Sequence, residues 1–231
     1  NSALQFIPIS QITGTGDGNQ FYSLFRDSKG FYWFGGANGL IRFTDPAGER
    51  HDAIWYRMGD KTYPLSHNRI RHIYEDKEQQ LWIATDGSIN RYDYATRQFI
   101  HYNIVDNTGT YNTNWTYYIF EDTAGQLWIS TCLGGIFVVD KRKLMQSTSG
   151  QYIAEQNYSV HNGLSGMFIN QIIPDNEGNV WVLLYNNKGI DKINPRTREV
   201  TKLFADELTG EKSPNYLLCD EDGLLWVGFH G

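Results

Sequence analysis

Apolar and polar residues follow one another along this chain in a pattern that occurs five times. Each copy has an apolar run, a polar turn that opens with aspartate, and a second apolar run that contains a tryptophan, as in DSKGFYWF and DTAGQLWI. Short apolar runs bounded by turn residues are typical of β-strands. The tryptophans lie 45 to 53 residues apart, close to the roughly 40 to 50 residues of one four-stranded propeller blade. They are Trp33, Trp82, Trp128, Trp181 and Trp226.

An aspartate precedes each tryptophan by six residues, and the five are Asp27, Asp76, Asp122, Asp175 and Asp220. An aspartate carboxylate can accept backbone N–H groups two residues on, so we expect each one to open a tight turn. Glycine follows three residues later in four copies, where a turn can require positive φ. Gln79 holds that place in the second copy and predicts a slightly different turn there. Because these residues recur once per copy, we interpret the aspartates as turn formers and the tryptophans as packing residues.

The inner strands carry adjacent apolar residues, such as Leu24 with Phe25 and Ile119 with Phe120. A sheet with one face in water would alternate apolar and polar residues, as a simple sandwich does, so both faces are expected to be buried. Propeller blades meet this requirement because each packs between two neighbours. The sequence therefore predicts an all-β fold, a β-propeller of four-stranded antiparallel blades with almost no helix.

We expect residues 1–231 to form a single propeller segment that is incomplete, with about four blades and a partial fifth. The fifth copy stops after its second strand. Residues 4–10 are expected to supply the outer strand of a last blade, as in the ring-closing exchange of propellers.

The motif D-x-x-G-x-x-W, followed by a glycine-containing stretch and an aromatic strand that ends in aspartate, resembles the two-component-regulator propeller repeat. The opening LQFIPIS and the segment FYSLFRDSKGFYWFGGANGLIRFTD are similar to the mature start of sensors with this repeat. The resemblance covers residues 4–231. It implies the N-terminal part of the periplasmic sensor region of a Bacteroidetes hybrid two-component system, whose intact protein resembles a sensor histidine kinase. The implied partners are the remaining blades, the downstream sensor domains and a second copy in a homodimer.

The net charge and the motifs of the sequence limit the classes of ligand and reaction that we expect. The net charge is −6 and no basic stripe is visible, so we expect no nucleic-acid partner for this segment. The sequence contains no HExxH, GxSxG or P-loop motif and no Cys/His spacing suited to a metal. We therefore predict no catalytic residue, no metal and no cofactor, and we do not expect this domain to be an enzyme.

Ligand-binding residues are expected in the loops before the first strand and after the second strand of each copy, where the repeat is least regular. These loops emerge on one face of the disc, and the aspartate turns emerge on the other. Trp115 is the sharpest candidate, because it lies in a polar stretch where other copies have Gln20, Arg69, Phe168 and Ser213. An aromatic side chain folded onto the next blade is the alternative interpretation. The predicted ligand-binding residues are Asn38, Asp86, Tyr111, Asn114, Trp115, Asn186, Asn187 and Lys188.

Three classes of function remain. Amides, charges and aromatic rings suit the hydroxyl groups and C–H faces of a sugar, so the first is a sensor domain that binds a glycan or oligosaccharide and signals to a kinase. The second is a propeller-type carbohydrate-active enzyme, a glycosidase or lyase, for which Asp86 is the only visible candidate carboxylate. The third is a protein-interaction scaffold, which would present apolar loop tips.

Overall fold

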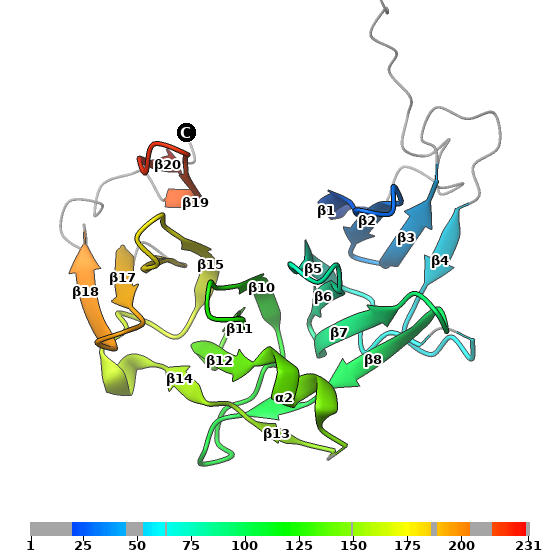
Figure 1. Cartoon of the computed structure of the whole chain (residues 1–231), viewed down its shortest axis with the longest axis horizontal. Coiled ribbons are helices and arrows are strands. Elements are labelled where there is room, and N and C mark those ends of the chain that lie inside the picture. The colour runs from blue at the N-terminus through cyan, green and yellow to red at the C-terminus, as the bar shows by residue number, and fades with distance from the viewer. Residues whose placement is uncertain are drawn as a thin grey trace, which may run out of the picture. The chain divides into compact units, whose positions relative to one another are not determined.

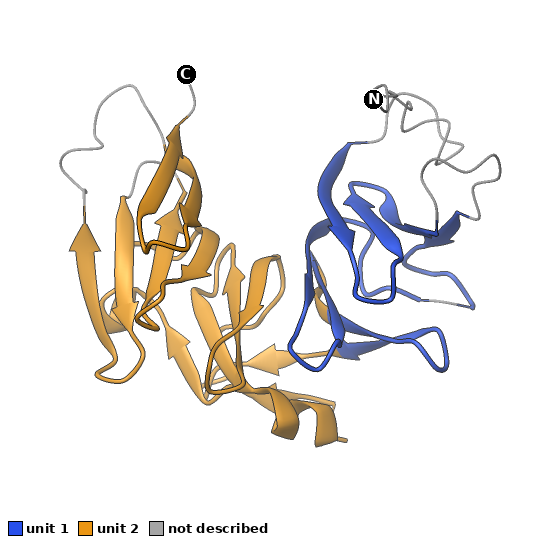
Figure 2. Ribbon diagram, turned by 45° about the horizontal axis from the view of Figure 1, so that its top comes forward, with its two compact units in different colours: residues 1–86, 90–101 blue, residues 87–89, 102–231 orange. Residues whose placement is uncertain are grey.

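The computed structural model describes residues 20–44, 53–62, 64–148, 150–185, 189–203 and 214–229. The predicted outer strand at 4–10 lies outside these residues, as do Asn186, Asn187, Lys188 and Ser213. The chain divides into two compact units (Figure 2). Unit 1 comprises residues 1–86 and 90–101, and unit 2 comprises residues 87–89 and 102–231.

Two four-stranded antiparallel sheets make up most of unit 1 (Figure 1), and in each the strand order follows the chain. The innermost strand of the first sheet packs on that of the second. The first sheet contains β1 (Phe21–Arg26), β2 (Tyr32–Gly36), β3 (Gly39–Phe43) and β4 (Ile54–Tyr56). The second contains β5 (Ile70–Glu75), β6 (Leu81–Thr85), β7 (Ser88–Asp93) and β8 (Gln98–Tyr102).

Unit 2 holds two further four-stranded sheets and a two-stranded hairpin, and its successive inner strands β10, β15 and β19 pack side by side. The sheets contain β10 (Thr116–Glu121), β11 (Gln126–Thr131), β12 (Ile136–Asp140) and β14 (Gln156–Tyr158), and then β15 (Ile169–Pro174), β16 (Val180–Leu184), β17 (Ile190–Asn194) and β18 (Glu199–Leu203). The hairpin is β19 (Pro214–Cys219) with β20 (Leu225–Phe229). These sheets confirm the predicted all-β fold of four blades and a partial fifth.

The third blade departs from the predicted pattern between its third and fourth strands. A short helix, α2 (Lys141–Gln146), follows β12, and the Asp140 side chain caps it by accepting from the Lys143 N–H at 3.1 Å. The chain then forms β13 (Tyr152–Ile153), which pairs in parallel with β9 (Ile104–Val105), before β14 completes the blade. A one-turn 3₁₀ helix (Val160–Asn162) leads to the next blade. Among the described residues, no helix has the length and apolar character needed to span a bilayer.

The repeated tryptophans differ in burial. Trp33, Trp82 and Trp128 are buried, and Trp128 stacks between Phe120 and Tyr158 with ring centroids 6.1 and 5.6 Å away. Trp226 is 59% exposed, so its interpretation as a packing residue does not fit this structure. The hairpin β19–β20 buries Leu217 against β15 and β16, and Trp226 lies on its other face beside its register partner Leu218.

The prediction that both faces of the inner strands are buried holds in part. Five of the six residues of β11 are buried. In β1, by contrast, half-buried and exposed residues alternate, and Tyr22 and Leu24 lie on the exposed side. β19 likewise exposes Tyr216 and Leu218. The prediction is therefore wrong for the first strand of the first and fifth copies, because within its unit each packs on a neighbour through one face.

The aspartate turns share one hydrogen-bonding scheme, which also holds the tryptophan. In the second copy, Asp76 Oδ1 accepts the backbone N–H groups of Glu78 and Gln80 at 3.0 and 2.8 Å, and Oδ2 accepts the Trp82 indole N–H at 2.8 Å. In the other four copies the indole-to-carboxylate distance lies between 2.7 and 3.1 Å. The carboxylate therefore fastens the turn to the second strand.

The second copy does not have a different turn, so that prediction is wrong. Gln79 adopts φ of +60° and its N–H donates to the Asp76 carbonyl at 2.9 Å, as Gly30, with φ of +88°, donates to Asp27 at 3.0 Å. Gln79 takes the left-handed conformation without a close neighbour to prevent it, since its side chain is exposed. A non-glycine residue in this region carries a conformational cost.

A second contact occurs in the second and fourth blades, where it joins the loop before the first strand to the third strand. Asn90 in β7 accepts the Ser66 N–H at 3.1 Å and donates to the Ser66 hydroxyl at 2.7 Å. Asp191 in β17 accepts both the N–H and the hydroxyl of Ser165 at 2.7 Å. Asp191 is almost fully buried, and burial raises the pKa of its carboxyl group, although the Ser165 hydrogen bonds and the charge of Lys202 oppose that shift.

Candidate functional site

One backbone hydrogen bond recurs in four copies at the edge of the blade where the first strand begins and the second strand ends. The residue just after the second strand donates its N–H to the carbonyl of the residue just before the first strand, with N-to-O distances of 2.9 to 3.3 Å. The resulting pairs are Ala37 with Gln20, Asp86 with Arg69, Cys132 with Trp115, and Tyr185 with Phe168. The sequence alignment that placed Gln20, Arg69, Trp115 and Phe168 at one position is thereby confirmed. The aspartate turns follow the other end of the first strands.

In unit 1 this edge is occupied by internal contacts. Asp86 is buried and binds Arg71 through two hydrogen bonds, from Nε to Oδ1 at 2.7 Å and from Nη2 to Oδ2 at 3.2 Å. Arg69 adds a weaker ion pair at 3.8 Å. Asn38 is exposed, and its carbonyl accepts the Arg57 Nε–H at 3.1 Å. A carboxylate held by a bidentate guanidinium is fixed in one orientation with both of its oxygens occupied, so it is not free to contact a substrate.

In unit 2 the loop before β10 presents Trp115 to solvent. The Thr113 N–H donates to the Ile104 carbonyl at 3.0 Å, and the Thr116 hydroxyl donates to the Thr113 carbonyl at 2.6 Å. Between these buried threonines Trp115 adopts φ of +55°, a conformation that is uncommon outside glycine and often marks a functional position. Its side chain is 47% exposed. The anchors on both sides therefore fix the backbone while the indole stays accessible.

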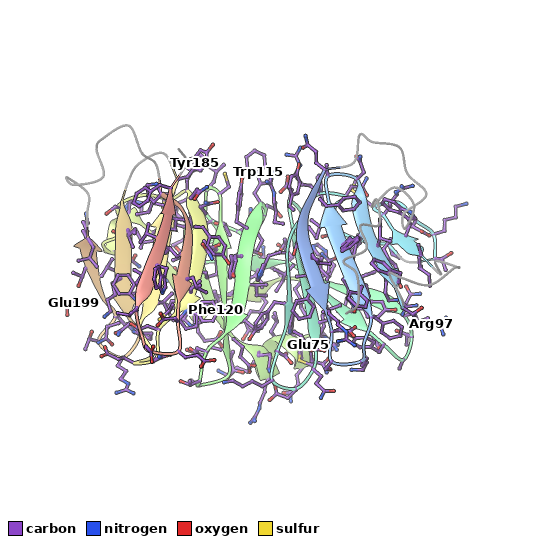
Figure 3. The ribbon with its side chains drawn as sticks, turned by 90° about the horizontal axis from the view of Figure 1, so that it is seen from above. Glu75, Arg97, Trp115, Phe120, Tyr185 and Glu199 are labelled. Atoms are coloured by element: carbon purple, nitrogen blue, oxygen red, sulfur yellow. The ribbon has the colours of Figure 1, made fainter. Side chains whose placement is uncertain are left out.

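Trp115 lies between two cavities of about 220 Å³ each, whose linings differ. The first is aromatic and is bounded by Trp115, Tyr117, Phe168 and Tyr185 together with Cys132, Ile169 and Asn170. Figure 3 shows Trp115 and Tyr185 at the same edge of unit 2, whereas Phe120 lies farther along β10. Phe168 and Tyr185 are 43% and 55% exposed. Three accessible rings thus gather around one hollow.

The second cavity is polar and flanks the other side of Trp115. Tyr111, Asn112 and Asn114 line it together with Thr110, Leu133 and Gly134. Among the described residues, the Tyr111 hydroxyl, the Asn114 amide and the Trp115 indole N–H have no hydrogen-bond partner. No Asp, Glu, His, Lys or Arg of the described chain lines either cavity. This arrangement can bind an uncharged ligand with apolar and hydroxylated faces.

The predicted site residues are therefore only partly brought together. Tyr111, Asn114 and Trp115 share one cavity, Asn38 and Asp86 lie in unit 1, and Asn186, Asn187 and Lys188 are outside the described residues. Sequence reasoning missed Tyr185, Asn112 and Leu133. Tyr185 was detectable in principle, because it directly follows the tryptophan strand and so meets Phe168 across the edge.

Comparison with known proteins gives a consistent result. The family model of the two-component regulator propeller matches residues 15–38 and 64–87. Two crystal structures of the extracellular domain of BT4673 from B. thetaiotaomicron, described as a putative one component and a putative hybrid two component system, are 97% and 98% identical, with TM-scores of 0.93 and 0.94. Both matches cover 100% of this chain and 31% of the crystallised chain, so this chain spans about a third of their length.

More distant structures share the fold alone. The extracellular domain of the putative hybrid two component system BT3049 from B. thetaiotaomicron is 20% identical, with a TM-score of 0.76 over 97% of this chain and 29% of that one. Virginiamycin B lyase from Staphylococcus aureus is 15% identical, with a TM-score of 0.66 over 93% of this chain and 64% of that one. No curated protein matches.

These findings confirm the predicted repeat family and its expected location outside the cytoplasm, since both near-identical structures are extracellular domains. The repeated aspartate–tryptophan turns and the four-stranded sheets agree with that assignment. The chain belongs to the two-component-regulator propeller family and is a segment of an extracellular propeller.

Proposed function

We propose that this propeller is the non-catalytic ligand-sensing part of a hybrid two-component system and that it binds a glycan at the Trp115 site. Binding would be passed through the remaining blades and downstream sensor domains to a histidine kinase. The observation that carries the proposal is an exposed indole held between an aromatic cavity and an amide-lined cavity.

The chemistry of a sugar fits both sides of Trp115. A pyranose ring has C–H faces that pack on aromatic rings and equatorial hydroxyl groups that both donate and accept hydrogen bonds. Trp115, Phe168 and Tyr185 supply the rings. The Tyr111 hydroxyl, the Asn114 amide and the Trp115 N–H supply polar groups that have no partner in the described part of the chain.

The enzymatic alternative has less support. A glycosidase needs two carboxyl groups that flank the scissile bond. Asp86 is the carboxylate that sequence analysis singled out, and Arg71 holds both of its oxygens. Virginiamycin B lyase is 15% identical to this chain, and that similarity supports a shared fold alone. A scaffold for another protein would require a larger apolar surface than the amide-rich cavity beside Trp115 offers.

The test is a binding screen on a complete extracellular domain of the length of the matched structures. Gluco-, galacto-, manno-, xylo- and arabino-oligosaccharides are titrated by calorimetry, and the mixtures are then analysed by mass spectrometry. Trp115→Ala should weaken binding at least tenfold. The matched control is Tyr22→Ala, which removes an aromatic ring of similar exposure (46%) that lines neither cavity. Cleaved product, or equal affinity of Trp115→Ala and Tyr22→Ala, would contradict the proposal.

A further inference from the structure

A third and larger cavity lies in unit 2 beyond the Trp115 site. It has a volume of about 460 Å³, and the loop 106–111 forms one wall and residues 154–162 the other. Its lining is polar, with Asn107, Gln156 and Asn162 among the amides. The Asn107 amide and the His161 imidazole have no hydrogen-bond partner among the described residues. We call this hollow the rim cavity.

The rim cavity adjoins the polar cavity beside Trp115. Thr110 and Tyr111 line both hollows, so one short segment separates them. Trp115 in turn separates the polar cavity from the aromatic one. The order is therefore rim cavity, Tyr111, polar cavity, Trp115, aromatic cavity. An aromatic side chain stands at each of the two boundaries.

The loop that carries Tyr111 is held in a fixed conformation. The buried Asp106 accepts the Tyr111 N–H through Oδ1 at 2.8 Å, and the Thr108 hydroxyl and N–H bind Oδ2. Burial opposes ionisation of Asp106, but these hydrogen bonds outweigh it and hold the pKa of this carboxyl group below its usual value. A carboxylate is thus held at the base of the loop, and the Tyr111 backbone is anchored to it.

The volumes restrict the length of the ligand. Pockets for small ligands usually measure roughly 300 to 1,000 Å³, and each of the two cavities beside Trp115 is smaller than that, at about 220 Å³. Either cavity alone would leave most of a ligand in solvent. A ligand that follows all three hollows would bury far more surface and would meet both aromatic boundaries.

The charges restrict the ligand further. In the described part of the chain no Lys or Arg lines any of the three cavities, and Asp106 and Glu155 both line the rim cavity. Glu155 is partly neutralised by Lys143 at 3.4 Å. Carboxylate and sulfate groups on a sugar are bound by cationic side chains, and the carboxylates here would repel them.

We propose that the three cavities form one continuous binding site for a neutral, linear oligosaccharide of at least about four units, with Tyr111 and Trp115 as stacking platforms between subsites. This inference rests on the proposed glycan function and adds the length and charge of the ligand. Short oligosaccharides bind beside Trp115, and the rim cavity contributes only when the chain is long enough to pass Tyr111.

The experiment measures affinity against chain length in the complete extracellular domain. Neutral gluco-, galacto-, manno-, xylo- and arabino-oligosaccharides of two to six units are titrated alongside oligogalacturonides of the same lengths. We expect at least one neutral series whose affinity rises tenfold or more between two and six units. Oligogalacturonides should bind at least tenfold more weakly than that series.

Two variants separate this inference from the function on which it rests. Asn107→Ala and His161→Ala each shorten an exposed side chain that lines the rim cavity and neither of the cavities beside Trp115, so both should keep the melting temperature of the wild type. Each should weaken hexasaccharide binding about fivefold and leave disaccharide binding within twofold. Trp115→Ala should weaken binding at every length.

The outcomes are distinguishable. Loss of binding in Trp115→Ala with no dependence on length, no effect of Asn107→Ala, or preference for oligogalacturonides would overturn the three-cavity site and leave glycan sensing intact. No effect of Trp115→Ala, or no binding by any neutral series, would overturn the proposed function and this inference together.

Discussion

The carboxylate–indole contact of the repeat gives the sharpest test of the fold, and the second copy is the best place to make it. Trp82 is 0% exposed, and its indole N–H donates to Asp76 at 2.8 Å. Asp76→Ala leaves that buried N–H without a partner, which costs about 1 to 3 kcal/mol, and it also removes two charge-assisted bonds to the turn. Water can reach the exposed Glu78 N–H after the change, which limits the cost of losing that bond. We therefore expect a total loss of about 2 to 4 kcal/mol in the free energy of unfolding.

A double-mutant cycle isolates the indole bond. Trp82→Phe keeps a buried ring but removes the donor, so Asp76→Ala should cost less in the Trp82→Phe background, with a coupling energy of about 1 to 2 kcal/mol. Urea unfolding of the chain, followed by circular dichroism, gives each value from the midpoint at constant m. The matched control is Asp220→Ala, which should lose less because the same contact to Trp226 is exposed there. A loss below about 1 kcal/mol at Asp76, or a coupling energy near zero, would show that the carboxylate–indole bond does not stabilise this blade.

Three further predictions concern stability. Trp128→Ala should cost about 3 to 5 kcal/mol in urea unfolding, because it removes a buried ring stacked on both faces, and a loss under about 1 kcal/mol would contradict that packing. Gln79→Gly should stabilise the chain by about 0.5 to 1 kcal/mol by relieving positive φ, whereas the control Glu78→Gly in the same turn should destabilise it, and equal effects would exclude strain at Gln79. Burial raises the pKa of Asp191 above its usual value of 3.8, so its stabilising contribution is complete below pH 3.8 and is lost as the pH rises through the folded-state pKa. Asp191→Asn can form with Ser165 the bonds that Asn90 forms with Ser66. The melting temperature of this variant minus that of the wild type should therefore increase from pH 4 to pH 7. A constant difference would show that Asp191 does not titrate in this range.

The fold was readable from the sequence because its determinants are local and repeated. A fixed separation of six residues between aspartate and tryptophan reflects a turn whose length lets Oδ2 reach the indole N–H. Sequence reasoning found the turn and the strand but did not connect them. It also assigned Trp226 to packing from its position in the repeat, although burial depends on what lies against the hairpin face.

The site was harder to predict from the sequence, because it is built from residues of different copies. Tyr111, Asn114 and Trp115 lie within one loop and were found together. The other wall of the aromatic cavity comes from Phe168 and Tyr185, more than 50 positions later. The Asp86 carboxylate was a candidate for catalysis in the sequence, and only the structure shows that Arg71 holds it at 2.7 Å.

The most direct test of glycan sensing is a crystal structure of the complete extracellular domain with the tightest-binding neutral oligosaccharide. We expect an intact glycan with a sugar ring against Trp115 and a chain that extends past Tyr111 toward Asn107. A glycan bound away from Trp115, or a cleaved glycan at this site, would contradict glycan sensing by this site.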